Sequence, residues 1–194
     1  MSRELRKAFD TDLRNGQQLA QKYADAANPT GLVALALCYL DGVGVKVNEK
    51  MAAELFKRAA VRGNPFGELG LGILYAEGRG VPKDYRKAFE WFQKSADHGI
   101  PEASGALAEF YEEGKGVRQD YRKAAQLYRK AADQGDAHSQ ASLGSFYELG
   151  DGVPKDIHKA VELYRKAAAQ GDAGGRAHLA SEYAKERLKA MGKR

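Results

Sequence analysis

The sequence predicts an all-α protein, a solenoid of stacked antiparallel helix pairs. Two observations predict it: the 194 residues repeat a pattern every 36 residues, and abundant alanine accompanies only 5 Pro. A period in this range is typical of proteins whose helical units stack side by side. The 22 Gly conflict with this prediction, because glycine weakens helices. Their positions resolve the conflict, since much of the glycine falls on the period.

The repeat is defined by fixed columns of residues. Glycine, tyrosine and leucine recur with the 36-residue step at Gly42, Gly78, Gly114 and Gly150; Gly44, Gly80, Gly116 and Gly152; Gly63, Gly99, Gly135 and Gly171; Tyr39, Tyr75, Tyr111, Tyr147 and Tyr183; and Leu35, Leu71, Leu107, Leu143 and Leu179. A small residue, glycine or alanine, follows each leucine. We expect it to let the two helices of a unit approach closely.

Each unit contains two helices separated by a glycine loop. In the second unit, Asn64 suits the N-cap and Pro65 the first turn of the first helix, named helix A below. The segment 78–82 (Gly-Arg-Gly-Val-Pro) is a loop. Asp84 caps the second helix, named helix B, and Gly99 supplies the left-handed position that ends it.

These units predict a single domain over residues 1–194. Four repeats occupy 28–63, 64–99, 100–135 and 136–171, between capping helices at 1–27 and 172–194. No apolar run approaches the roughly 20 residues that span a bilayer, so we expect no membrane insertion. The first ten residues lack the apolar core of a signal peptide, which favours a cytoplasmic protein; a removed leader would make it periplasmic.

The second unit carries the fullest set of motif residues, namely Leu71, Gly72, Tyr75, Gly78, Gly80, Val81, Asp84, Lys87, Ala88, Trp91, Lys94, Ala96 and Gly99. In these residues the sequence resembles the Sel1-like repeat family, a relative of the tetratricopeptide repeat, over residues 28–183. The resemblance implies a right-handed α-solenoid, helices A lining a concave surface, and a binding scaffold in place of an enzyme. Two departures are local: Met51 replaces the lysine of the other units, and Ile100 starts the third unit where a capping side chain is expected. The chain also differs from the disulfide-clamped subfamily, because Cys38 is its single cysteine.

The sequence offers little catalytic chemistry. It contains no His-Glu-x-x-His, Gly-x-Ser-x-Gly, P-loop or Ser-x-x-Lys motif. The Gly-x-Gly elements follow helices and recur four times, so we interpret them as turns and not as phosphate cradles. Cys38 shares a column with Leu74, Phe110 and Phe146, which predicts a small buried hydrophobe. We therefore predict a protein without enzymatic activity, cofactor or metal.

Columns that differ between repeats are free to form a binding site. By analogy with tetratricopeptide helices, the concave positions include Val33, Leu37, Leu40, Phe66, Leu69, Ile73, Glu77, Glu102, Glu109, Glu112, Glu113, His138, Ser145 and Glu148. This surface begins apolar and becomes acidic. Exposed apolar patches framed by charge are typical of binding sites. The alternative is that Val33, Leu37, Leu69 and Ile73 pack against the N-terminal cap.

The leading hypothesis is a scaffold or adaptor that holds a protein partner, with a basic partner segment over the glutamates. A second hypothesis, which the family resemblance permits, is a bacterial immunity protein bound to a toxin or effector enzyme; signalling proteins are further candidates. A third is a β-lactam-binding or hydrolytic enzyme, which the missing motifs disfavour. The calculated isoelectric point near 9.2 suggests nucleic-acid binding, but glutamates interrupt the basic columns of helix B, so we expect none.

Overall fold

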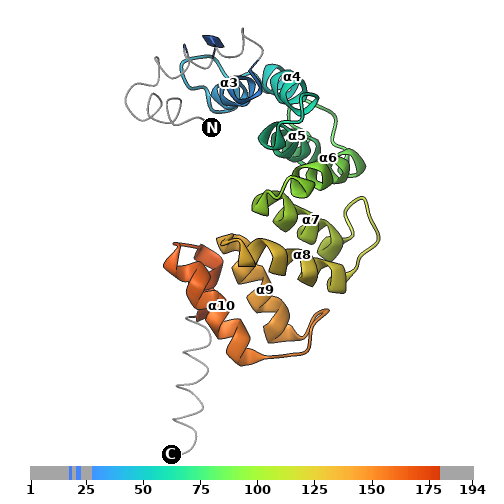
Figure 1. Cartoon of the computed structure of the whole chain (residues 1–194), viewed down its shortest axis with the longest axis vertical. Helices are drawn as coiled ribbons and strands as arrows, with labels where there is room; N and C mark the ends of the chain where they lie inside the picture. The colour runs from blue at the N-terminus through green and yellow to red at the C-terminus, as the bar shows by residue number, and fades with distance from the viewer. Residues whose placement is uncertain (1–17, 19–20, 23–27, 180–194) are drawn as a thin grey trace, which may run out of the picture. The chain divides into compact units, whose positions relative to one another are not determined.

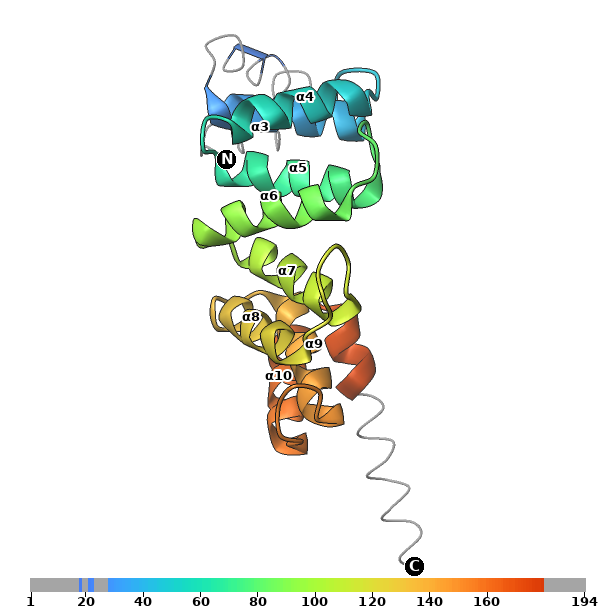
Figure 2. The same ribbon diagram turned by 90° about the vertical axis from the view of Figure 1, so that its right-hand side faces the viewer.

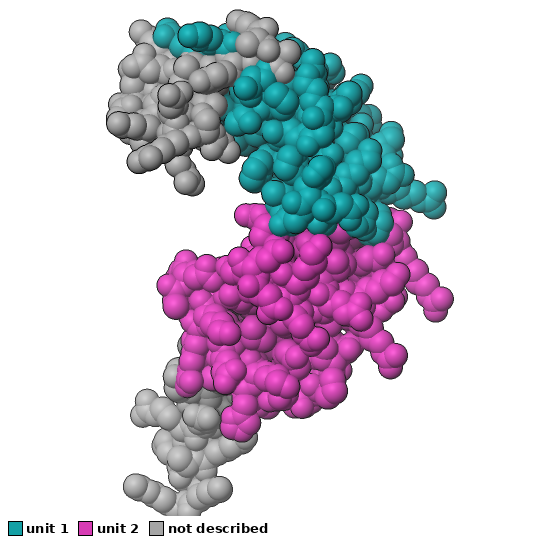
Figure 3. Space-filling model, in the orientation of Figure 1, with its two compact units in different colours: residues 1–100 teal, residues 101–194 magenta. Residues whose placement is uncertain are grey.

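A computed structural model describes residues 18, 21–22 and 28–179 (Figure 1). The predicted capping helices at 1–27 and most of 172–194 lie outside this part. The chain divides into two compact units, residues 1–100 and 101–194, coloured separately in Figure 3. Each unit is described by itself below.

The described residues form helices joined by loops, as predicted. Unit 1 contains α3 (Pro29–Asp41), α4 (Glu49–Ala60), α5 (Pro65–Glu77) and α6 (Tyr85–Asp97). Unit 2 contains α7 (Pro101–Glu113), α8 (Tyr121–Asp133), α9 (Ala137–Leu149) and α10 (Ile157–Ala169), followed by helical residues 173–179. Helices A are α3, α5, α7 and α9. Each packs on the helix B that follows it, and α4 also packs on α5, as Figure 2 shows. None of the helices in the described part is long and apolar enough to cross a membrane.

The helices begin at the predicted capping residues and end near the predicted glycines. Asn48, Asp84, Asp120 and Asp156 cap the four helices B, each side chain accepting a hydrogen bond from a backbone N–H of the first turn. All twelve glycines of the three glycine columns have positive φ, which side-chain-bearing residues rarely adopt. Twelve of the 22 glycines therefore lie in the turns at or after the helix ends and not in helix interiors.

In two loops, one in each unit, the second glycine also serves the stacking of repeats. A Cβ on Gly80 would collide with the backbone carbonyl of Glu49, in the first turn of α4. A Cβ on Gly152 would collide in the same way with the carbonyl of Tyr121, in α8. The loops of the second and fourth repeats thus lie directly on the helix B that precedes them in their own unit.

In the second and fourth repeats the small residue after the leucine lies against an aromatic ring of helix B. A Cβ on Gly72 would stand 2.6 Å from the ring of Phe92, and one on Gly144 would stand 2.6 Å from the ring of Tyr164. This confirms the predicted close approach in these two repeats. Cys38 is 1% exposed within the core, as predicted, and burial raises the pKa of its thiol to about 11. The thiolate, which is the reactive form, is therefore disfavoured.

Candidate functional site

An apolar groove runs between the two helices A of unit 1. Its volume is about 390 Å³, and its lining combines five residues of the predicted concave surface with two others: Val33, Leu37, Phe66, Leu69 and Ile73, together with Phe56 and Gly70. Leu37, Phe66 and Ile73 are 37%, 45% and 39% exposed. At this exposure each of these side chains gives up more than a third of its free energy of burial, which is about 25 cal/mol per Å² of apolar surface.

The floor of the groove comes from helix α4. Phe56 is buried, and its ring reaches the groove because Gly70 has no side chain: a Cβ there would stand 2.5 Å from a ring atom of Phe56. Sequence reasoning missed Phe56, because this residue belongs to helix B. The sequence feature that could have indicated it is the combination of Gly70 on helix A with the large aromatic residue Phe56 on the neighbouring helix B.

Carboxylates lie one turn beyond the groove. Asp41 follows Leu37 by four residues and Glu77 follows Ile73 by four, so each lies on the same helix face as its groove residue. Both helices end there without a lysine or arginine in the last turn. Glu77 lies 3.4 Å from Arg79. Leu40 is the predicted site residue of unit 1 that packs against the core and does not line the groove.

Unit 2 carries a hydrogen-bonded histidine and glutamate at the positions where unit 1 is apolar. His138 and Glu109 occupy the same repeat columns as Phe66 and Leu37, and His138 Nε2 lies 2.9 Å from a carboxylate oxygen of Glu109. The hydrogen bond to Glu109 raises the pKa of His138. The two units therefore present different chemistry at equivalent positions.

Two of the predicted concave glutamates bind tyrosines of their own repeat. The hydroxyl of Tyr128 donates to Glu112 at 2.7 Å, and that of Tyr164 donates to Glu148 at 2.7 Å. Glu148 also lies 3.5 Å from Nδ1 of His178, whose ring stacks on Tyr164. Both tyrosine rings are buried, so these carboxylates contribute to the fold whatever else they contact.

The remaining predicted residues of unit 2 are dispersed. Glu113 forms a close ion pair with Lys115. Glu102 is exposed in the first turn of α7, where an acidic residue favours the helix dipole, and Ser145 is half-buried on α9. The structure therefore brings five predicted residues together in unit 1, whereas Glu109, Glu112, Glu113 and Glu148 already have internal partners.

Charge is segregated between the two sets of helices. Helices A carry eight carboxylates and no lysine or arginine. Helices B carry thirteen lysines and arginines against six carboxylates. Counting charge by repeat conceals this separation, because every repeat contains one helix of each kind; counting by helix would have found it.

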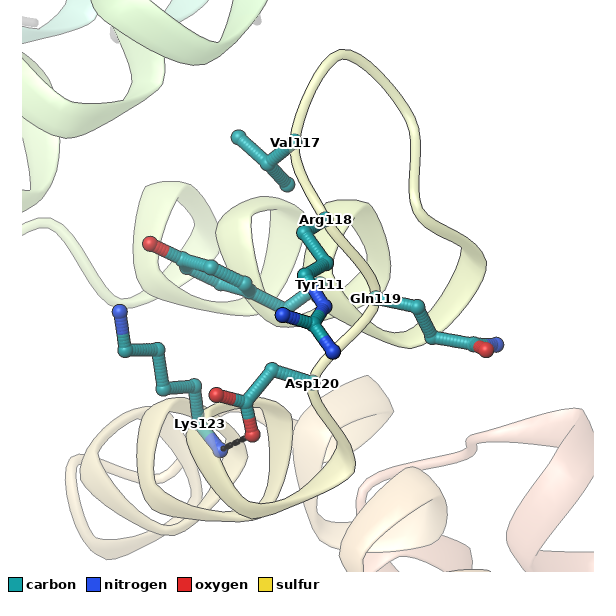
Figure 4. Close-up of a pocket in the computed structure, with 6 residues that line it drawn as sticks. All are labelled: Tyr111, Val117, Arg118, Gln119, Asp120 and Lys123. Carbon is teal, nitrogen blue, oxygen red and sulfur yellow. Dashed lines mark hydrogen bonds between the residues drawn. The ribbon is translucent and has the colours of Figure 1, made fainter.

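A second, polar hollow of about 560 Å³ lies beside the loop between α7 and α8 (Figure 4). It is lined by Tyr111, Val117, Arg118, Gln119, Asp120 and Lys123. Asp120 accepts from the backbone N–H of Lys123 at 3.0 Å, and Lys123 Nζ lies 5.1 Å from the Tyr111 ring centre. The same lysine–tyrosine contact recurs between Lys87 and Tyr75 and between Lys159 and Tyr147. Recurrence indicates that this arrangement supports the repeat.

Within the described part of the chain, no three His, Cys, Asp or Glu side chains gather as a metal site would require. Most carboxylates of helices A contact an arginine, lysine, histidine or tyrosine of their own unit. The polar hollow is built from contacts that recur in the repeats, whereas the apolar groove of unit 1 is not repeated in unit 2.

Comparison with known proteins gives a consistent result. The family model described as "Sel1 repeat" matches four times, at residues 29–64, 65–100, 101–136 and 137–172, one residue later than the predicted repeats. No curated protein matches the sequence.

Three solved structures illustrate the likeness. A Sel1 repeat protein from Oxalobacter formigenes is 34% identical, with TM-score 0.86 over 95% of this chain and 76% of the other. The protective antigen c5321 of uropathogenic Escherichia coli, described as having an SLR fold, is 33% identical, with TM-score 0.77 over 87% of this chain and 36% of the antigen. The immunity protein Pa5087 of Pseudomonas aeruginosa shares the fold at 22% identity, with TM-score 0.63 over 89% of this chain and 66% of the other.

Proposed function

Because the chain belongs to the Sel1 repeat family, we propose that it is a non-catalytic interaction module that binds a protein partner in the groove of unit 1. The observation that carries the proposal is the gathering of three exposed large hydrophobic side chains, Leu37, Phe66 and Ile73, in one groove. Single exposed hydrophobic residues are ordinary on protein surfaces, but several in one concave place are typical of a binding surface.

A partner would gain most of its affinity from these side chains. Interfaces derive their free energy of binding from a few desolvated residues near the centre, and truncating one commonly costs 2 kcal/mol or more. The groove of about 390 Å³ exceeds twice the volume of a cavity of about 150 Å³ that takes one benzene ring. It therefore has room for about two large apolar side chains of a partner.

The test compares two matched substitutions. Ile73→Asp places a charge in the groove, whereas Ile157→Asp places the same charge on α10 of unit 2; the two isoleucines are 39% and 37% exposed. Proteins that co-purify with the tagged wild-type chain are identified, and their affinity for each variant is measured by calorimetry. We expect Ile73→Asp to weaken binding at least tenfold and Ile157→Asp to leave it unchanged. Equal effects of the two substitutions would refute the proposal.

A narrower candidate is an immunity protein that neutralises a cognate toxin or effector enzyme. Its support is the fold shared with the immunity protein Pa5087, a likeness that at 22% identity concerns the fold alone. The test is co-expression with the product of the neighbouring gene in a susceptible host. Protection by the wild type and its loss with Ile73→Asp would support this role, and growth arrest despite the wild-type chain would exclude that gene product as the target.

A further inference from the structure

The charges around the groove indicate which kind of partner segment it would accept. We infer that the groove of unit 1 receives a segment with two bulky apolar side chains next to a lysine or arginine, with the cation over Asp41 and Glu77. This inference rests on the proposed function and specifies the partner's chemistry at the same surface.

The apolar part of the inference follows from the lining. Every lining side chain is a hydrocarbon, from Val33 and Leu37 on α3 to Phe66, Leu69 and Ile73 on α5, with Phe56 as the floor. No hydrogen-bonding side chain among them could compensate a polar group entering the groove, and such a group would lose its hydration. The segment must therefore present apolar side chains here.

The cationic part follows from the carboxyl ends of α3 and α5. Asp41 and Glu77 lie one turn beyond Leu37 and Ile73, and the carbonyl ends of both helices add partial negative charge at the same place. Helices α3 and α5 contain no lysine or arginine. Arg79 forms ion pairs with both Glu77 and Glu49, and its Nε lies 2.7 Å from Glu49. No described residue forms an ion pair with Asp41.

These charges favour one sign of partner. Complementary charge at the rim of an interface raises the association rate and disfavours partners of the wrong sign. A segment with aspartate or glutamate beside its apolar residues would meet like charge at this end of the groove. A segment with lysine or arginine would meet Asp41, which is exposed and available.

The experiment selects peptides from a displayed library of random dodecapeptides on four full-length chains. These are the wild type, Asp41→Lys/Glu77→Lys, Ile73→Asp, and the matched control Glu113→Lys. Glu113 occupies the same repeat column as Asp41 and Glu77 but lies in unit 2. Lysine at the end of a helix is favourable, so the charge-reversed chain should fold; circular dichroism verifies this.

We expect the wild type and Glu113→Lys to enrich peptides with two bulky apolar residues adjacent to lysine or arginine. The double charge reversal should select acidic residues instead and bind the wild-type peptides at least tenfold more weakly. Apolar peptides without a charge preference on the wild type would overturn this inference and leave the proposed function intact. If peptides were enriched no more on the wild type than on Ile73→Asp, both this inference and the proposed function would be overturned. That result is also the one expected if the chain's own N-terminal residues cover the groove.

Discussion

Substituting Tyr128 and Glu112 singly and together tests whether the glutamates of unit 2 belong to the fold. Repeat two carries Phe92 and Ala76 in the columns where repeat three carries Tyr128 and Glu112. Tyr128→Phe removes the hydroxyl that donates to Glu112 at 2.7 Å, and Glu112→Ala removes the acceptor. The double variant reproduces the pair that the protein already uses one repeat earlier.

The expected magnitudes follow from burial. Tyr128 is 1% exposed, so without Glu112 its buried hydroxyl would keep only its hydrogen bond with Ser142. A buried donor left fully unsatisfied costs about 1–3 kcal/mol, and we expect Glu112→Ala to cost the lower end of that range. A hydrogen bond to a charged group contributes about 1.5–3 kcal/mol, and Glu112 is half-buried, so we expect Tyr128→Phe to cost about 1.5 kcal/mol. Because both single variants lose the same bond, the double variant should cost less than their sum by about 1–2 kcal/mol.

The assay is urea unfolding followed by circular dichroism. Trp91, the single tryptophan, lies on α6 and reports on unit 1 through its fluorescence, which serves as an internal control. We expect the substitutions to destabilise the structure detected by circular dichroism more than that detected by Trp91. If the losses of unfolding free energy in the two single variants simply added in the double variant, Glu112 would not stabilise the fold through Tyr128. It would then again be a candidate for contact with a partner.

Three further outcomes are expected. Gly80→Ala should lower the free energy of unfolding in urea by clearly more than Gly99→Ala, which should cost about 1 kcal/mol, because both have positive φ but only Gly80 has backbone in the way of a Cβ. Burial raises the pKa of Glu68, so the free energy of unfolding should fall as pH rises through that pKa. In the same urea assay, Glu68→Gln should be more stable than the wild type at pH 7, and this difference should shrink toward pH 4. Glu109→Gln should lower the pKa of His138 in an NMR titration, because the hydrogen bond raises it; in the wild type the stability due to protonated His138 is present at low pH and lost as pH rises through that raised pKa.

The fold was predictable because its determinants are local. A residue with positive φ interrupts a helix, and glycine adopts positive φ easily. All twelve glycines of the periodic columns have positive φ, so their positions in the sequence mark the loops. Capping side chains act on the next two or three residues, so Asp84 and its equivalents could be assigned from sequence alone. The close approach at Gly72 was also predictable, because a small residue recurs at every repeat.

The groove was predictable in part. Five predicted residues line it because their columns share one face of helix A, which helix geometry determines. Phe56 could not be assigned in this way, since its ring enters from a neighbouring helix through the space left by Gly70. Whether these residues contact a partner stays a prediction.

The acidic part of the surface required the structure. Helical position alone suggested that Glu112 and Glu148 were available to a partner, whereas each accepts a tyrosine hydroxyl. The signal lay in two columns that change together: phenylalanine on helix B accompanies leucine or alanine on helix A, and tyrosine accompanies glutamate. The four pairs are Phe56 with Leu40, Phe92 with Ala76, Tyr128 with Glu112, and Tyr164 with Glu148.

The central claim is that the groove of unit 1 binds apolar groups beside a cation, and the chain's three isoleucines, Ile73, Ile100 and Ile157, allow a direct measurement. Selective methyl labelling of isoleucine gives one NMR signal for each, with Ile73 in the groove and Ile157 on the surface of α10. The protein is titrated with 2-phenylethylammonium and separately with 3-phenylpropionate, which present a phenyl ring beside opposite charges. We predict that the ammonium compound shifts Ile73 at lower concentration than the carboxylate does, while Ile157 stays in place. An unmoved Ile73, or equal shifts of Ile73 and Ile157, would contradict the account.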